Sequence, residues 1–144
     1  MLRRWYIASG LFLCQNIVMA YVEFNPNPTG RRVGDCSVRA VAAALDISWE
    51  EAFALMAINA YQMGDVISAD SVWGSVLRQH GFYRSYLLND CPDCYTAGEF
   101  AEDHPEGIYV LGFGGHVATI KNGELMDAWD SSKEIPQFVW YKED

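Results

Sequence analysis

The chain has 144 residues, of which 51% are hydrophobic, and carries a net charge of −9 at pH 7. A chain of this length and composition can bury a hydrophobic core and is too apolar to remain disordered. The negative charge argues against nucleic acid and anionic membrane surfaces as partners. We therefore expect one folded domain over residues 19–144, with neither a nucleic acid nor a membrane as its partner.

Residues 1–18 begin with a positive segment followed by a short apolar run, as signal peptides do. Polar residues Gln15 and Asn16 interrupt the run, no small-residue cleavage site follows, and the run is too short to span a membrane. Two alternatives stay open, an exported protein with a signal-like segment or an upstream extension before a true start at Met19. We favour the extension, and with it a cytoplasmic location.

The N-terminal half is predicted to be mainly helical. A loop rich in proline and glycine ends at Gly34, and Asp35 can cap a helix that begins at Cys36. Gly81 is suited to the position just after a helix. The elements expected here are a strand over 21–24 and helices over 36–45, over 49–63 and from 68 or 70 up to Gly81.

Two capping boxes mark helix starts, because each places a glutamate three residues after a hydroxyl side chain. Ser48 with Glu51 begins the helix over 49–63. Thr96 with Glu99 begins a short helix that ends at about residue 103.

The C-terminal half changes to the two-residue period of β-strands. Asn122-Gly123 predicts a tight hairpin, and Gly114-Gly115 either forms a β-bulge or leaves room for close approach of a backbone or substrate. Helices followed by strands predict an α+β fold in which the helices pack on a C-terminal antiparallel sheet. The expected strands cover 82–88, 108–113, 116–121, 124–129 and 137–142.

The Asn122-Gly123 hairpin also predicts a pair of side chains that carry chemistry. Its register places Trp129 opposite His116 and Asp127 diagonally beside it on the same face of the sheet, whereas Asp130 points to the other face. A carboxylate in that position can orient the imidazole and stabilise its protonated form, and the indole can shield the pair from water. A register slip of one residue would substitute Asp130 for Asp127.

Cys36 is the candidate nucleophile. A thiol at a helix start lies beside free N–H groups and the positive end of the helix dipole, which favour the thiolate. Cys36, His116 and Asp127 would then form a catalytic triad of nucleophile, base and orienting acid. The alternative is a buried structural cysteine and a sheet histidine that do not meet, because the pattern alone does not bring the helix to the strand.

These residues resemble the papain-like cysteine peptidase superfamily in their order, Cys, His and then Asp. They also resemble small bacterial and phage proteins in three segments: Asp35-Cys36-Ser37-Val38-Arg39-Ala40, His116-Val117 and Asp127-Ala128-Trp129-Asp130. The resemblance implies a papain-like fold with Cys36 packed against His116. It also implies thiol-dependent hydrolysis of an amide bond in a peptide or protein substrate, with no cofactor.

The chain departs from the papain pattern at two positions. Gly30 stands where papain-type enzymes carry the glutamine of the oxyanion hole, and Ser37 follows the cysteine where they carry an aromatic residue. We expect the oxyanion to be held by the Cys36 N–H group, with Asn25 or Asn27 as a possible source of an amide. Arg39, one turn after Cys36, is expected to bind Asp35 or another acidic neighbour.

Other functions remain open at this stage. The same triad would serve a cell-wall amidase or acyltransferase, and the fold without catalysis would serve as a binding module. Cys91-x-x-Cys94 is compatible with half of a zinc site or a redox pair, but His80 and His104 lack ligand spacing relative to it. We therefore expect no metal site.

Overall fold

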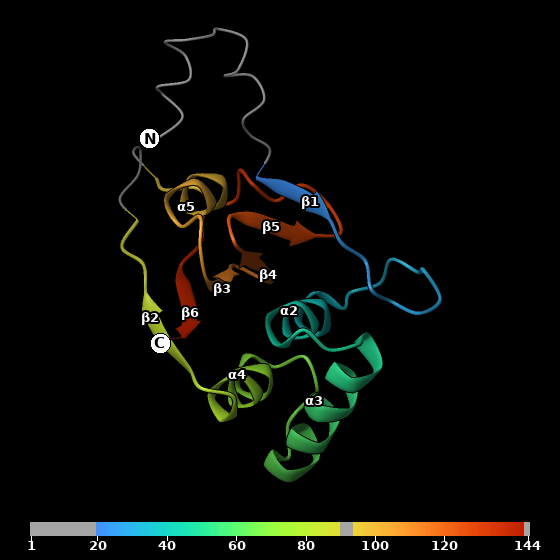
Figure 1. Ribbon diagram of the computed structural model, residues 1–144. Helices are drawn as coiled ribbons and strands as arrows, with labels where there is room; N and C mark the ends of the chain where they lie inside the picture. The colour runs from blue at the N-terminus through green and yellow to red at the C-terminus, as the bar shows by residue number, and fades with distance from the viewer. Residues whose placement is uncertain (1–19, 90–93, 143–144) are drawn as a thin grey trace, which may run out of the picture.

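The computed structural model describes residues 20–89 and 94–142 (Figure 1). The interpretations of residues 1–18 and of Cys91 therefore lie outside the described residues. The described chain is a mixed α+β structure with four helices and a six-stranded open sheet. The helices are α2 (Cys36–Leu45), α3 (Trp49–Met63), α4 (Asp70–Gln79) and α5 (Ala97–Asp103). The strands are β1 (Tyr21–Glu23), β2 (Phe82–Tyr86), β3 (Ile108–Phe113), β4 (His116–Lys121), β5 (Glu124–Asp127) and β6 (Phe138–Lys142).

The sheet has the order β1-β5-β4-β3-β6-β2, and its strands are antiparallel except for β1, which runs parallel to β5. The sheet departs from the expected C-terminal antiparallel one at a single edge, where the N-terminal strand β1 joins it in parallel with β5, whereas β2 at the other edge pairs antiparallel with β6. Backbone groups explain the parallel edge, because the N–H of Leu125 donates to Ala20 at 2.6 Å and that of Phe24 to Asp127 at 2.7 Å. An isolated β5 would leave these groups without partners.

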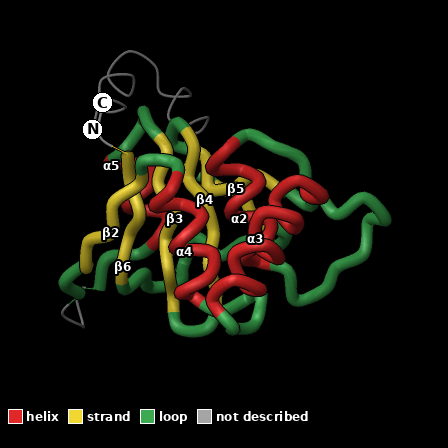
Figure 2. Tube along the Cα trace, turned by 90° about the horizontal axis from the view of Figure 1, so that it is seen from below, coloured by secondary structure: helices red, strands yellow, loops and turns green. Residues whose placement is uncertain are grey.

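Helix α2 packs directly on β4, while α3 and α4 flank α2 on the same side of the sheet (Figures 1 and 2). Its alanines allow this close approach, and side chains of β4 bind its carbonyl groups. Thr119 donates to the Ala40 carbonyl at 2.8 Å, and Lys121 to that of Ala43 at 3.2 Å. A second apolar cluster joins α5 to β3, β4 and β5. Among the described residues, no helix is both long and apolar enough to cross a lipid bilayer.

Both predicted capping boxes are confirmed, with Ser48 and Thr96 each accepting the N–H of the glutamate three residues later. Helix α4 ends at Gln79, and Gly81 follows it with φ +91°, as a residue at this position requires. The predicted cap on α2 is wrong in one respect, because the Asp35 side chain makes no capping hydrogen bond.

The predicted register of the β4–β5 hairpin is confirmed by the pairs Thr119–Met126, Ile120–Leu125 and Lys121–Glu124. Strand β5 ends at Asp127, two residues earlier than expected, because the Asp127 carboxylate accepts the N–H of Ala128 at 2.7 Å and turns the chain. Strand β2 is also two residues shorter than expected.

Gly114-Gly115 does not form the β-bulge that was one of the two alternatives. The two glycines are the turn of a hairpin that pairs Phe113 with His116, and Gly115 has φ +84°, which suits glycine. This turn places His116 at the first position of β4.

Candidate functional site

Cys36 is the first residue of α2 and follows the loop from Asn25 to Gly34. Its side chain is half-buried and lies against the start of β4. The ring of His116 and the backbone of Val117 lie beside the thiol and stabilise its ionised form. The contact between the helix and the histidine, which spacing in the sequence does not predict, is therefore present in the structure.

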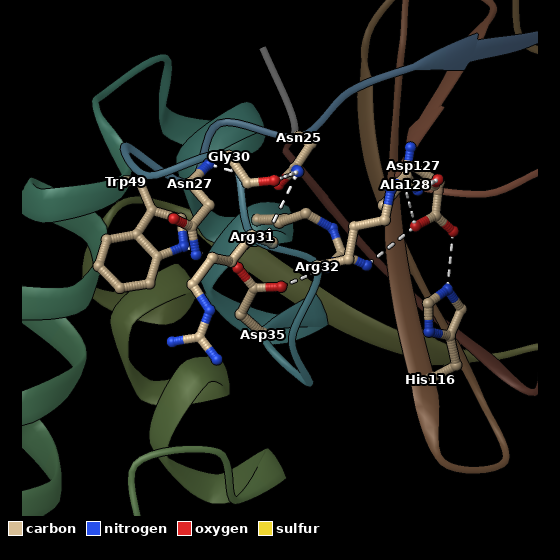
Figure 3. A network of polar contacts seen from close by, with 11 residues as sticks. Asn25, Asn27, Gly30, Arg31, Arg32, Asp35, Trp49, His116, Asp127 and Ala128 are labelled. Atoms are coloured by element: carbon tan, nitrogen blue, oxygen red, sulfur yellow. Dashed lines mark hydrogen bonds and ion pairs between the residues drawn. The ribbon is translucent and has the colours of Figure 1, made fainter.

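His116 lies between the thiol and a carboxylate. Its Nε2 atom lies 2.7 Å from Oδ2 of Asp127, so Nδ1 is the ring nitrogen left for Cys36 (Figure 3). The ring of Trp129 lies 4.8 Å from that of His116, and the ring of Phe113 lies 5.7 Å from it, as measured between ring centres. These contacts leave only 15% of the His116 side chain exposed.

Asp127 is the polar centre of the site, with a side chain that is 1% exposed. Oδ2 accepts from His116 at 2.7 Å and from the Ser131 hydroxyl at 2.6 Å. Oδ1 accepts from the Ala128 N–H at 2.7 Å and from Arg39 at 3.1 Å. Four donors on one carboxylate fix its orientation and keep it ionised in spite of burial.

Arg39 extends the network to α3. Its guanidinium binds Asp127 through one nitrogen and Asp35 through another, and the Trp49 indole donates to the second oxygen of Asp35 at 2.9 Å. Figure 3 shows Asp35 between Trp49 on one side and the His116–Asp127 pair on the other. The predicted tie between Arg39 and Asp35 is confirmed, and Arg39 also contacts the candidate triad directly.

The charges of the site favour a thiolate–imidazolium pair. Burial opposes ionisation of Cys36, but the hydrogen bonds from His116 and Val117 and the charges of His116 and Arg39 lower the pKa of the thiol. Burial likewise disfavours the charged imidazole, but the contacts with Asp127 and Cys36 outweigh it and raise the pKa of His116 to about 9. Both shifts stabilise a thiolate beside an imidazolium relative to the neutral pair.

Asn25 and Asn27 direct their side chains into their own loop. The Asn25 amide donates to the carbonyl groups of Gly30 and Arg31 at 3.3 and 3.4 Å, and the Asn27 side chain accepts from Thr29. The hydrogen bonds of these two side chains thus stay within residues 25–31, away from the thiol and the imidazole.

Two residues near Asp127 concern what the sequence did and did not predict about the surroundings of this carboxylate. Ser131, fully buried, is a ligand of Asp127 that sequence reasoning missed, although its place four residues after the acid in a polar turn is a usable signal. Asp130 is exposed and accepts the N–H of Ser132 at 3.0 Å, so the alternative register that substitutes it for Asp127 does not occur.

A cavity of about 450 Å³ adjoins the start of α2. It lies between the loop over residues 27–34, the first turn of α2 and the first turns of α3, and both neighbours of Cys36 line it. Within residues 20–89 and 94–142, no three His, Cys, Asp or Glu side chains are grouped to hold a metal ion. Cys94 is disulfide-bonded.

Comparison with known proteins identifies no relative for this architecture. No protein-family model matches the chain, and neither a curated protein nor a solved structure is significantly similar to it. The function must therefore be inferred from the geometry of the site.

Proposed function

We propose that this protein is a papain-like thiol hydrolase that cleaves an amide bond in a peptide or protein substrate. One observation carries the proposal: a single imidazole lies beside the thiol of Cys36 and is hydrogen-bonded to the buried carboxylate of Asp127. A histidine held by a carboxylate without a thiol is common in sheets, and a cysteine alone is most often a core residue. The combination at a helix start is the arrangement that activates a nucleophile.

In the proposed reaction, the Cys36 thiolate attacks the substrate carbonyl. His116 then donates its proton to the leaving amine, and Asp127 holds the ring while its protonation state changes. Water next attacks the thioester with His116 as the base, which releases the acid and restores the thiol. Trp129 and Phe113 limit the access of water to the imidazole.

The start of α2 is the proposed source of oxyanion stabilisation. The first N–H groups of a helix have no acceptor within the helix, and Asp35 does not occupy them with its side chain. The N–H of Cys36 is therefore free to bind the negative oxygen that forms during attack. Asn25 and Asn27 would need to turn away from their loop partners to assist.

The test is the reactivity of Cys36 towards iodoacetamide as a function of pH. We expect Cys36 in the wild-type protein to alkylate at pH 7 roughly tenfold or more faster than a free thiol, because its pKa is lowered. His116→Ala removes the imidazole and its charge, so it should abolish the advantage. Peptide mapping by mass spectrometry assigns the alkylation to Cys36 among the four cysteines.

His80→Ala is the matched control, because the His80 ring binds the carbonyl of Val76 at the end of α4. This variant should alkylate like the wild type. The proposal fails if Cys36 reacts no faster than a model thiol near pH 7 and His116→Ala makes no difference.

A further inference from the structure

The cavity beside α2 is apolar on most of its walls. The rings of Trp49 and Phe53 stack at 5.1 Å between centres, and Phe53 remains 41% exposed although it belongs to the helix that packs on α2. A cavity of about 450 Å³ is large enough for a side chain or a small ligand. Its apolar lining consists of Pro28, Val33, Val38, Trp49, Phe53 and Ile67.

Polar donors lie where this cavity meets α2. Ser37 lines the cavity and is only 4% exposed, yet its hydroxyl makes no hydrogen bond to any residue in the described part of the chain. The N–H groups of Ser37 and Val38 belong to the first turn of α2, which has no side-chain cap. Among the described residues no fully buried side-chain N or O atom lacks a partner, so the unbonded Ser37 hydroxyl keeps some accessible surface. An accessible hydroxyl and uncapped N–H groups together favour an acceptor that carries negative charge.

The charges around the cavity point the same way. The Asp35 carboxylate also lines it, but Arg39 and Trp49 already bind both of its oxygens. Arg31 lines the cavity as well, and among the described residues its guanidinium has no carboxylate partner. A cavity with free donors, one unpaired guanidinium and apolar walls fits a carboxylate attached to an apolar group.

Resting on the proposed function, we propose that this cavity binds the C-terminal residue of the substrate and that the enzyme releases that residue from peptides. The α-carboxylate binds the Ser37 hydroxyl and the first-turn N–H groups, close to Arg31. The apolar side chain lies against Trp49 and Phe53. The substrate class is thus a peptide with a free carboxyl end and a large apolar last residue.

The spacing of donors along α2 supports this assignment. The Cys36 N–H would bind the carbonyl oxygen of the bond to be cleaved, and the N–H groups of Ser37 and Val38 follow it in the same helical turn. Successive residues in any chain are about 3.8 Å apart between Cα atoms. The carboxyl group one residue beyond the cleaved bond can therefore reach the donors one or two residues beyond Cys36.

The reaction balances with the groups already described. The bond from Cys36 Sγ to the carbonyl carbon forms, the C–N bond of the last peptide bond breaks, and His116 gives its proton to the departing amine. The products of this step are a free amino acid and a thioester. Water then adds to the thioester, one proton returns to the Cys36–His116 pair, and the shortened peptide leaves as an acid.

The experiment compares two forms of one peptide, acetyl-Ala-Ala-Phe with a free carboxylate and the same peptide with a C-terminal amide. Binding is measured by calorimetry on Cys36→Ala, which holds the substrate without cleaving it, and release of phenylalanine or its amide is measured on the wild type. We expect the acid to bind at least about tenfold more tightly than the amide, because hydrogen bonds to a charged group contribute this much. The kcat/KM for cleavage of the acid should also be at least about tenfold higher than that of the amide.

Two variants locate the effect. Ser37→Ala and Arg31→Gln are made in the active protein for cleavage and in the Cys36→Ala background for binding. Each should reduce the preference for the acid to within about threefold. The controls are Ser85→Ala and Arg84→Gln, which alter the same residue types at exposed positions on β2 and should keep the full preference.

The outcomes separate this inference from the proposed function. Equal binding and cleavage of acid and amide, or cleavage of internal bonds only, would overturn the inference while the hydrolase stands. A preference that survives both Ser37→Ala and Arg31→Gln would also overturn it. Tight binding of the acid without any release of phenylalanine would overturn the inference, because the cavity would then not hold a leaving group. The proposed hydrolase itself is tested separately, by the rate of Cys36 alkylation.

Discussion

Helices α2, α3 and α5 each follow a residue whose side chain can accept hydrogen bonds from the first helical turn, namely Asp35, Ser48 and Thr96. The starts of α3 and α5 use that ability fully. In both, the hydroxyl accepts an N–H and the glutamate three residues later binds back to the capping residue. At α2 the aspartate has the same opportunity, yet its side chain makes no capping bond.

The difference follows from where the Asp35 carboxylate is held. Arg39 and Trp49 bind it, and Arg39 carries the connection on to Asp127. A residue that could stabilise its own helix therefore stabilises a buried ionic network instead, and the first turn of α2 keeps its N–H groups for another partner. A capped helix start serves stability alone, whereas this uncapped start serves the proposed chemistry of Cys36.

The network at the start of α2 is tested most strongly at its centre. Asp127→Asn keeps the shape of the side chain but removes the charge that raises the pKa of His116, so we expect the kcat/KM for peptide hydrolysis to fall by roughly 10⁴. The wild type should lose activity as the pH rises through about 9, because the imidazolium then loses the proton it must donate. In the variant this loss should begin at lower pH.

The matched control is Asp130→Asn, which removes an exposed carboxylate three residues away. It should leave both the rate and the pH dependence within about twofold of the wild type. An Asp127→Asn enzyme that keeps its rate and its alkaline limit near 9 would contradict the role assigned to Asp127.

Arg39 is expected to matter for stability as much as for activity. Arg39→Met leaves the buried carboxylates of Asp35 and Asp127 without their guanidinium, and breaking a buried ion pair in this way costs about 3–5 kcal/mol. The free energy of unfolding from urea titration measures the loss. The control is Asp46→Asn, since the Asp46 side chain is 91% exposed and pairs with Lys121 at 3.6 Å, and a surface pair of this kind is worth at most about 1 kcal/mol.

A second measurement separates the two roles of Arg39. Arg39→Lys retains the charge but cannot bind two carboxylates in the planar geometry of a guanidinium. If Arg39 only supports folding, folded Arg39→Lys protein should alkylate at Cys36 with an unchanged pH profile. If it also positions Asp127, the acid limb of that profile should move to higher pH.

Local patterns were sufficient to predict most of the fold. Capping boxes and the Asn122-Gly123 turn depend on neighbours in sequence, and these predictions are confirmed with their register. The parallel pairing of β1 with β5 depends on a contact between residues about one hundred positions apart, for which a three-residue strand contains no signal. The pairing at the β1 edge of the sheet was therefore not predicted, whereas the strands of its centre were.

The candidate site divides in the same way. The pairing of His116 with Asp127 follows from one hairpin and could be predicted, whereas the meeting of Cys36 with His116 depends on how α2 packs on β4 and required the structure. The cap predicted for Asp35 was wrong because two partners from later in the chain compete for its carboxylate. Local capping rules do not include such competitors.

The smallest expected effect concerns the capped starts of α3 and α5. Ser48→Ala removes the cap of α3 and should lower the free energy of unfolding by about 1 kcal/mol, measured by urea titration, as loss of a helix cap usually does. Thr96→Ala should cost a similar amount at α5. Neither variant touches Cys36 or His116, so both should leave the rate of Cys36 alkylation at pH 7 unchanged.

Ser48 precedes Trp49, which binds Asp35, so the two caps differ in their distance from the network. If Ser48→Ala slows alkylation and Thr96→Ala does not, the start of α3 contributes to the site through Trp49, and the division between helix starts for stability and for chemistry fails at α3. If both variants slow it to the same degree, global destabilisation rather than position determines the reactivity of Cys36. Unchanged alkylation in both variants would mean that, of these three helix starts, the start of α2 alone determines the reactivity of Cys36.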